Sequence, residues 1–126
     1  MAIHAYSLEK LQHFTLLATS TITAIGDQTG VDLHQLEGDI QIILNATAAG
    51  SGATFDCRIE HSDTQGGTYA AVTGGGFTQI GNTASKQVLT LNSDELKRWI
   101  RFSVTTDAGT GSSAMTVNGY GLKKYG

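Results

Sequence analysis

Alternating apolar and polar side chains dominate the sequence from residue 38 onward. Between residues 38 and 44, the apolar side chains Ile40, Ile42 and Leu44 fall on one face. Residues 53–60 alternate more cleanly, with an apolar or small side chain at every second position. A period of two is typical of a strand with one face in a core and the other in water. The pattern therefore predicts two half-buried strands in this part of the chain.

Further segments alternate in the same way and are separated by turn-forming residues. The glycine- and serine-rich stretch 45–52 predicts an antiparallel hairpin between the first two strands. Three consecutive glycines at 74–76 predict a loop or a bulge, because glycine adopts positive φ without steric cost. Residues 92–96 predict a single capped helical turn, with Asn92 or Ser93 as the N-cap. The other expected strands lie within 14–24 and at 31–33, 77–80, 86–91, 97–105 and 114–122.

Many short strands, with turn signals every ~8–12 residues, are typical of an all-β sandwich or barrel. The length of 126 residues suits one compact domain. We predict a single antiparallel β-sandwich with an N-terminal arm, in which residues 1–12 form the arm and residues 13–126 the sandwich. A jelly-roll-like topology is the first expectation. An immunoglobulin-like topology shares the same alternation and is the alternative.

The first dozen residues follow neither the strand alternation nor a helical stripe. Their apolar side chains are Ile3, Tyr6, Leu8 and Leu11. Such a segment is either a frayed terminus or an arm that orders against another subunit. Four apolar side chains in one tail favour the arm. We expect them, together with neighbouring Phe14, to contact a partner.

Small residues are abundant, since 16 residues are Gly, and large apolar side chains are sparse. A fully buried large side chain contributes about 1.5–3 kcal/mol, whereas ordering a hundred residues costs on the order of 100 kcal/mol of conformational entropy. A thin core favours a protein that gains part of its stability from subunit or partner contacts. A β-protein with long polar turns is also rich in Thr and Gly, so composition leaves both interpretations open.

Charge and cysteine content exclude several classes of protein. The formal net charge of -3 provides no basic surface for nucleic acid or an anionic membrane. The apolar stretches are only a few residues long, so we expect no membrane span. The one cysteine supports neither a disulfide scaffold nor a cysteine-based zinc site. The N-terminus lacks the basic start and uninterrupted apolar run of a secretory signal, so we expect synthesis in a cytoplasm.

The most enzyme-like cluster is Glu60-His61-Ser62-Asp63. A carboxylate and an imidazole in close sequence can serve metal binding or acid–base chemistry. However, adjacent strand residues point to opposite faces, and Ser62 and Asp63 suit a turn, so we expect a structural role. Cys57 lies on an apolar strand face and is expected in the core. The sequence contains no recognised catalytic or phosphate-binding motif, and we expect no enzyme activity, cofactor or metal.

Trp99 and Arg101 lie on the strand face opposite Ile100 and Phe102. An exposed Trp beside an Arg is typical of an interface hot spot or a sugar-stacking platform. A sandwich with both faces covered would bury Trp99 without any function. Both interpretations stay open, with burial slightly favoured, and Trp99 and Arg101 join the candidate interface residues.

Three stretches of the chain form a recognisable set: residues 36–44, the run R-I-E-H-S-D-T at 58–64 with G-T-Y at 67–69, and residues 91–102, which end in R-W-I-R-F. Together they resemble small virion structural proteins of tailed bacteriophages. The chain is most similar to capsid decoration, or cement, proteins with a β-sandwich or jelly-roll fold. The resemblance covers residues 30–122. Its motifs are structural, so it implies no catalytic residue.

The resemblance implies a protein that binds the outer surface of an assembled capsid shell. Its partners would be the major capsid protein and further copies of itself, as a dimer or trimer, and its location would be the virion after synthesis in the host cytoplasm. Tail and fibre components share such sandwiches and are an alternative. A carbohydrate-binding module is the alternative from another class, with glycan-stacking candidates Trp99, Tyr69, Tyr120 and Tyr125.

Overall fold

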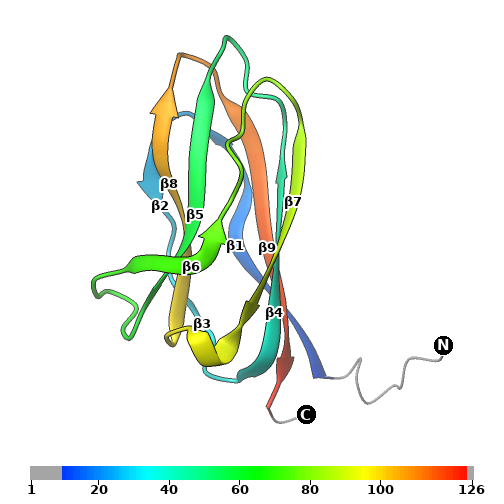
Figure 1. Cartoon of the computed structure of the whole chain (residues 1–126), viewed down its shortest axis with the longest axis vertical. Helices are drawn as coiled ribbons and strands as arrows, with labels where there is room; N and C mark the ends of the chain where they lie inside the picture. Colours follow the sequence, from blue (N-terminus) through cyan, green and yellow to red (C-terminus); the bar gives the residue numbers. More distant parts are fainter. Residues whose placement is uncertain (1–9, 125–126) are drawn as a thin grey trace, which may run out of the picture.

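A computed structural model of the chain describes residues 10–124, which form two antiparallel sheets packed face to face (Figure 1). One sheet has the strand order β1-β9-β4-β7 and the other β2-β8-β5-β6, with β3 also pairing with β8. The prediction of an all-β sandwich is confirmed. The strands are β1 (Leu11–Ile22), β2 (Gly26–Asp27), β3 (Val31–Asp32), β4 (Leu36–Ala46), β5 (Thr54–Ser62), β6 (Ala70–Gly76), β7 (Ser85–Asn92), β8 (Trp99–Ala108) and β9 (Ser113–Lys123).

The strand order is that of a jelly roll. Strands pair from the ends of the chain inward: β1 with β9, β2 and β3 with β8, β4 with β7, and β5 with β6. A long antiparallel ribbon paired in this way and rolled up gives the two sheets of a jelly roll. The jelly-roll expectation is therefore confirmed, and the immunoglobulin-like alternative is wrong.

The expected hairpin between residues 38–44 and 53–60 is also wrong. β4 and β5 belong to different sheets, so the segment between them crosses from one layer to the other. Its turn chemistry is present all the same, because Ser51 and Gly52 have positive φ and Ala53 donates a backbone hydrogen bond to Gly50. Turn residues determine where the chain reverses, but they leave open which strand it pairs with afterwards.

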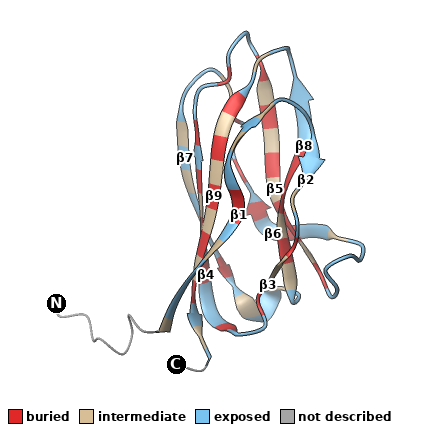
Figure 2. Ribbon diagram, turned by 180° about the vertical axis from the view of Figure 1, so that it is seen from behind, coloured by how far each residue is buried: buried red, intermediate tan, exposed pale blue. Residues whose placement is uncertain are grey.

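The apolar faces of the strands fill the space between the sheets. Ile40, Ile42 and Leu44 of β4 are fully buried, as are Ile100 and Phe102 of β8. Figure 2 shows buried and more exposed residues alternating along β4, β5 and β9. The core faces predicted from the alternation are confirmed.

Two local predictions are confirmed as well. Asn92 caps the short helical turn η1 (Ser93–Glu95), and its Oδ1 accepts a hydrogen bond of 2.8 Å from the Asp94 N–H. The glycines at 74–76 belong to β6, and Gly74 has a φ of 79°. The pairing of β5 with β6 shifts register there, so these glycines form a bulge.

The first strand begins within the expected arm. Leu11 and Gln12, the last two arm residues, already pair with Leu122 and Gly121 on β9. The rest of the expected arm, with Ile3, Tyr6 and Leu8, lies outside the described residues, apart from Lys10.

Candidate interaction surface

The outer face of the sheet β1-β9-β4-β7 is exposed to solvent, and we call it the open face. Cross-strand register arranges its side chains in rows that run across the four strands. Val88, on the edge strand β7, is 52% exposed, while Ile43 beside it on β4 is half-buried. The two central rows contain no carboxylate and no amine: they are Val88–Ile43–Asn118–Thr15 and Thr90–Gln41–Tyr120–His13.

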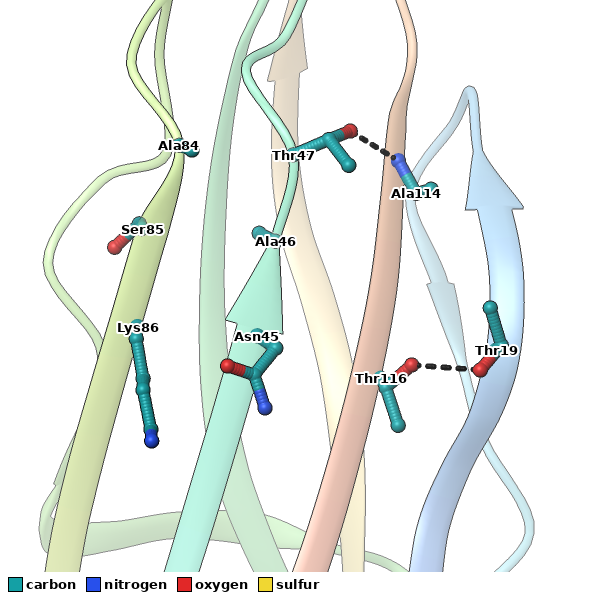
Figure 3. A pocket seen from close by; sticks show the side chains of 9 residues that line it. All are labelled: Thr19, Asn45, Ala46, Thr47, Ala84, Ser85, Lys86, Ala114 and Thr116. Atoms are coloured by element: carbon teal, nitrogen blue, oxygen red, sulfur yellow. Dashed lines mark hydrogen bonds between the residues drawn. The ribbon is translucent and has the colours of Figure 1, made fainter.

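A hollow of about 440 Å³ lies at one end of the open face, where β4 ends and β7 begins (Figure 3). Thr19 and Thr116 share a hydrogen bond of 2.8 Å between their hydroxyls. Asn45 and Lys86 make no side-chain hydrogen bond or ion pair with other residues in 10–124, so their polar groups are available to a partner. The hollow is lined by Thr19, Asn45, Ala46, Thr47, Ala84, Ser85, Lys86, Ala114 and Thr116.

The opposite end of the open face has a different chemistry. Leu11 at the start of β1 pairs with Leu122 at the end of β9, and the two are 48% and 43% exposed. Glu37 of β4 lies opposite Leu122 of β9, and Asp39, two residues later on β4, lies opposite Asn92 of β7. This end, which we call the leucine end, therefore combines the exposed pair Leu11–Leu122 with two carboxylates, whereas the hollow contains the amine of Lys86.

The outer face of the second sheet is occupied by an ion-pair network centred on Glu60, which is only 4% exposed. One carboxylate oxygen of Glu60 lies 2.7 Å from Arg58 and the other 2.7 Å from Arg101. Arg101 also reaches Asp27 at 3.3 Å. A buried carboxylate needs charged or hydrogen-bonding partners, and here two guanidinium groups satisfy both of its oxygens.

The segment between β5 and β6 covers part of this network. The Tyr69 ring lies 4.1 Å from the Arg101 guanidinium carbon, in a cation–π contact. The Tyr69 hydroxyl donates a hydrogen bond to the Gln65 carbonyl, and the Gln65 side chain donates to the Gly30 carbonyl. Burial raises the pKa of Tyr69. Part of the second sheet is thus covered by its own chain, whereas the open face has no such cover among residues 10–124.

The candidate interface residues within 10–124 lie in different environments. Leu11 is exposed on the open face. Phe14 packs toward the core, where its ring leaves no room for a Cβ on Gly119. Trp99 is half-buried, with the Arg98 guanidinium 5.4 Å from its ring. Arg101 takes part in the Glu60 network, and its side chain is 21% exposed.

Side chains of the enzyme-like cluster at 60–63 make contacts within the fold. His61 Nδ1 accepts a hydrogen bond of 3.2 Å from the Lys97 N–H, and Ser62 Oγ accepts one from the Thr64 N–H. Burial, assisted by the charge of Lys97, lowers the pKa of His61. Among residues 10–124, no group of three or more His, Cys, Asp or Glu side chains is placed to hold a metal. That part of the chain also contains no helix long and apolar enough to cross a membrane.

The main members of the open face cannot be identified from the sequence. The alternation places Lys86 and Val88 on a strand, but it does not indicate that Asn45 and Thr116 lie beside them on neighbouring strands. One signal was available: Val88 is an apolar residue at a position that otherwise alternates as polar, between Lys86 and Thr90. An apolar side chain on the solvent face of a strand is a reason to look for a partner.

No known protein family matches the chain, and no curated protein matches its sequence. Solved structures share its fold at low sequence identity. The crystal structure of the SPBc2 prophage-derived protein YomS matches with a TM-score of 0.55 and 13% identity, over 90% of this chain and 93% of that one. The PBSX exported protein XepA matches with a TM-score of 0.62 and 14% identity, over 91% of this chain and 38% of that one.

The fold also occurs within larger viral and enzymatic chains. The VP2 subviral particle of infectious bursal disease virus matches with a TM-score of 0.51 and 16% identity, over 90% of this chain and 33% of that one. A Clostridium thermocellum xylanase with CBM22-1 and GH10 modules, complexed with xylohexaose, gives 0.50 and 7%, over 95% and 27%. Identities this low demonstrate a shared fold. The prophage-derived and viral neighbours are consistent with the resemblance to phage virion structural proteins.

Proposed function

We propose that this protein is a structural component of a bacteriophage virion and that it binds the assembled capsid shell as a decoration, or cement, protein. The observation that carries the proposal is the jelly-roll sandwich shared with YomS over nearly the full length of both chains. The three stretches that resemble phage decoration proteins add to it. They fall on β4, on the end of β5 with the loop after it, and on the segment from the end of β7 through η1 into β8.

Stabilisation by such a protein would operate through binding equilibrium. A protein that binds only the assembled lattice shifts the balance away from disassembly by mass action. Modest contacts suffice where the same contact repeats over many sites of the shell. The N-terminal arm is the expected contact with the major capsid protein. It joins the sheet at Leu11, so it enters at the leucine end of the open face.

Phage heads made without this protein provide the test. Purified protein would be added to heads from a deletion strain, the heads sedimented, and the bound copies counted. We expect saturable binding at a fixed number of copies per head and a higher temperature for DNA release. Heads that bind no protein, or that bind it without becoming more resistant to heat, would contradict the proposal. Isolated tails serve as the control, and preferential binding to tails would favour the tail-associated alternative.

The carbohydrate-binding alternative receives less support from the geometry. Its aromatic candidates are divided between the two sheets: Trp99 is half-buried on β8 of the second sheet, where Tyr69 lies over Arg101. Tyr120 lies on the open face against His13, with ring centres 5.1 Å apart. Tyr125 lies outside the described residues. Stacking platforms for sugars need aromatic rings on one exposed face, so we place glycan binding second to a structural role.

A further inference from the structure

We infer that the open face is a self-association surface. Two copies pack open face to open face about a twofold axis, and the Leu11–Leu122 pair of each copy sits in the hollow of the other. The inference stands whether or not the protein binds a capsid, because it depends only on the two unlike ends of this face.

The two ends of the open face are complementary in shape. At one end is the hollow, with small residues such as Ala114 and Thr116 in its lining. At the other end, Leu11 and Leu122 expose about half of their surface to water. The twofold axis runs perpendicular to the strands, midway between the two central rows. It places the row Lys86–Asn45–Thr116 of one copy over the end of the other copy that contains Leu122 and Asp39. Each leucine pair then meets a hollow, and the contact forms twice.

The two ends are also complementary in charge. Lys86 in the hollow makes no ion pair with other residues in 10–124, and the same holds for Glu37 and Asp39 at the leucine end. The twofold arrangement brings each lysine to the carboxylates of the other copy. The central rows meet near the axis and contain no carboxylate or amine, so no such charges of like sign are brought together there.

The size of the face sets the expected strength of the dimer. Four strands spaced ~4.8 Å apart and about eight residues long, at ~3.4 Å each, present roughly 500 Å². Two faces would bury ~1,000 Å², close to the lower limit for a specific interface. We therefore expect a dimer that dissociates on dilution.

Two single-cysteine additions test the geometry of the contact. In the proposed dimer, Leu122 of one copy lies over Thr116 of the other copy. The two copies of Leu122 lie far apart, at opposite ends of the contact. Packed sheets are ~10 Å apart, too far for a direct disulfide, so a short bismaleimide is the suitable cross-linker. The native Cys57 will not interfere, because it is 4% exposed.

We expect a cross-linked dimer when Leu122→Cys and Thr116→Cys proteins are mixed, and little when either is treated alone. Asp63→Cys, on an exposed residue away from the open face, is the matched control and should not cross-link with either. No product in the mixture, or equal product from each variant alone, would overturn the proposed packing.

Charge reversal provides a second, independent measurement. Lys86→Glu and Asp39→Lys should each weaken the dimer about tenfold, which corresponds to about 1.4 kcal/mol. The double variant should recover most of the loss, because the ion pair is rebuilt with reversed sign. Lys97→Glu, which lies off the open face, is the control. Sedimentation velocity over a concentration series reports the dissociation constants. A wild-type protein that stays monomeric at the highest concentrations would overturn the inference without bearing on capsid binding.

Discussion

Among single residues, Glu60 has the most demanding environment, because its carboxylate is buried between two guanidinium groups. Glu60→Ala leaves Arg101, whose side chain is 21% exposed, without its closest partner. Breaking a fully buried pair costs about 3–5 kcal/mol. Arg58 is 43% exposed and can turn to water, so we expect a loss of about 1–3 kcal/mol in the free energy of unfolding. Urea denaturation measures it.

The control for that experiment is Asp63→Ala. Asp63 is 82% exposed and lies 3.8 Å from Lys97. An exposed ion pair of this kind contributes little, so the change should stay within about 0.5 kcal/mol. Equal losses in the two variants would show that burial does not strengthen the Glu60 network.

The buried thiol of Cys57 should make the free energy of unfolding depend on pH in the alkaline range. Burial, with a smaller effect from Asp56, raises the pKa of the Cys57 thiol from 9.0 to about 12. Between these values the unfolded chain loses this proton and the folded chain keeps it, so stability falls as pH rises, by up to about 1.4 kcal/mol per pH unit. Cys57→Ala lacks this contribution. Its destabilisation relative to wild type, measured in urea, should therefore shrink between pH 8 and pH 10.5. A constant difference would contradict the burial of the thiol.

How far the sequence predicts a residue depends on how local its partners are. The structural role of Glu60 and His61 follows from their opposite faces and the turn chemistry beside them. Arg58, two residues away on the same strand face, is a local partner of Glu60. Arg101 could not be predicted, because it lies 41 residues away and is brought to Glu60 only by the pairing of β5 with β8. The same holds for Phe14, whose inward position depends on pairing with β9.

At the level of elements, alternation predicts strands reliably because it reports which face of a strand is buried. It carries no information about neighbours, and this is why the strands 38–44 and 53–60 were expected to pair although β4 and β5 lie in different sheets. In a jelly roll, most partners are distant in sequence, as in the pairing of β1 with β9. Turn residues report only the local reversal, so strand order had to come from the structure.

The pairing of β1 with β9 depends on a close approach at Gly119. A Cβ on this residue would meet the Phe14 ring. Gly119→Ala should therefore displace the ring and cost about 1–3 kcal/mol in the free energy of unfolding, as overpacked cores do. Gly81→Ala is the matched control, because a Cβ there meets nothing within 4 Å. Thermal unfolding compares the two, and a Gly119→Ala protein as stable as the control would contradict the packing of Phe14.

The N-terminal arm should be separable from the sandwich. The strands begin at Leu11, and the buried apolar core begins with Leu16. Removal of residues 1–9 should leave the circular dichroism of the sheet and its urea midpoint unchanged, while abolishing binding to phage heads. Removal of residues 1–12 should also lower stability, because Leu11 and Gln12 pair with β9. A protein without residues 1–9 that unfolds, or that binds heads normally, would contradict the expected role of the arm.

For the molecule as a whole, the two outer faces of the sandwich differ in which side chains they expose to solvent. The outer face of the second sheet carries the Glu60 network, which Tyr69 covers in part, whereas the first sheet presents exposed Val88, Leu11 and Leu122. The low content of large apolar residues favours a protein that gains part of its stability from contacts with neighbouring subunits or partners. Of the four large apolar residues exposed among residues 10–124, Leu11, Val88 and Leu122 lie on the open face, and Ile25 lies just before β2. Contacts with neighbours would therefore have the most effect at the open face.

The central claim is that this protein is a component of the phage particle, and counting its copies there tests the claim most directly. Virions of the phage that encodes the chain would be purified on a density gradient, and the protein quantified by mass spectrometry against the major capsid protein. We predict a fixed, lattice-scale ratio that survives repeated purification. Absence of the protein from the particles, or a few copies that disappear on further purification, would contradict the account.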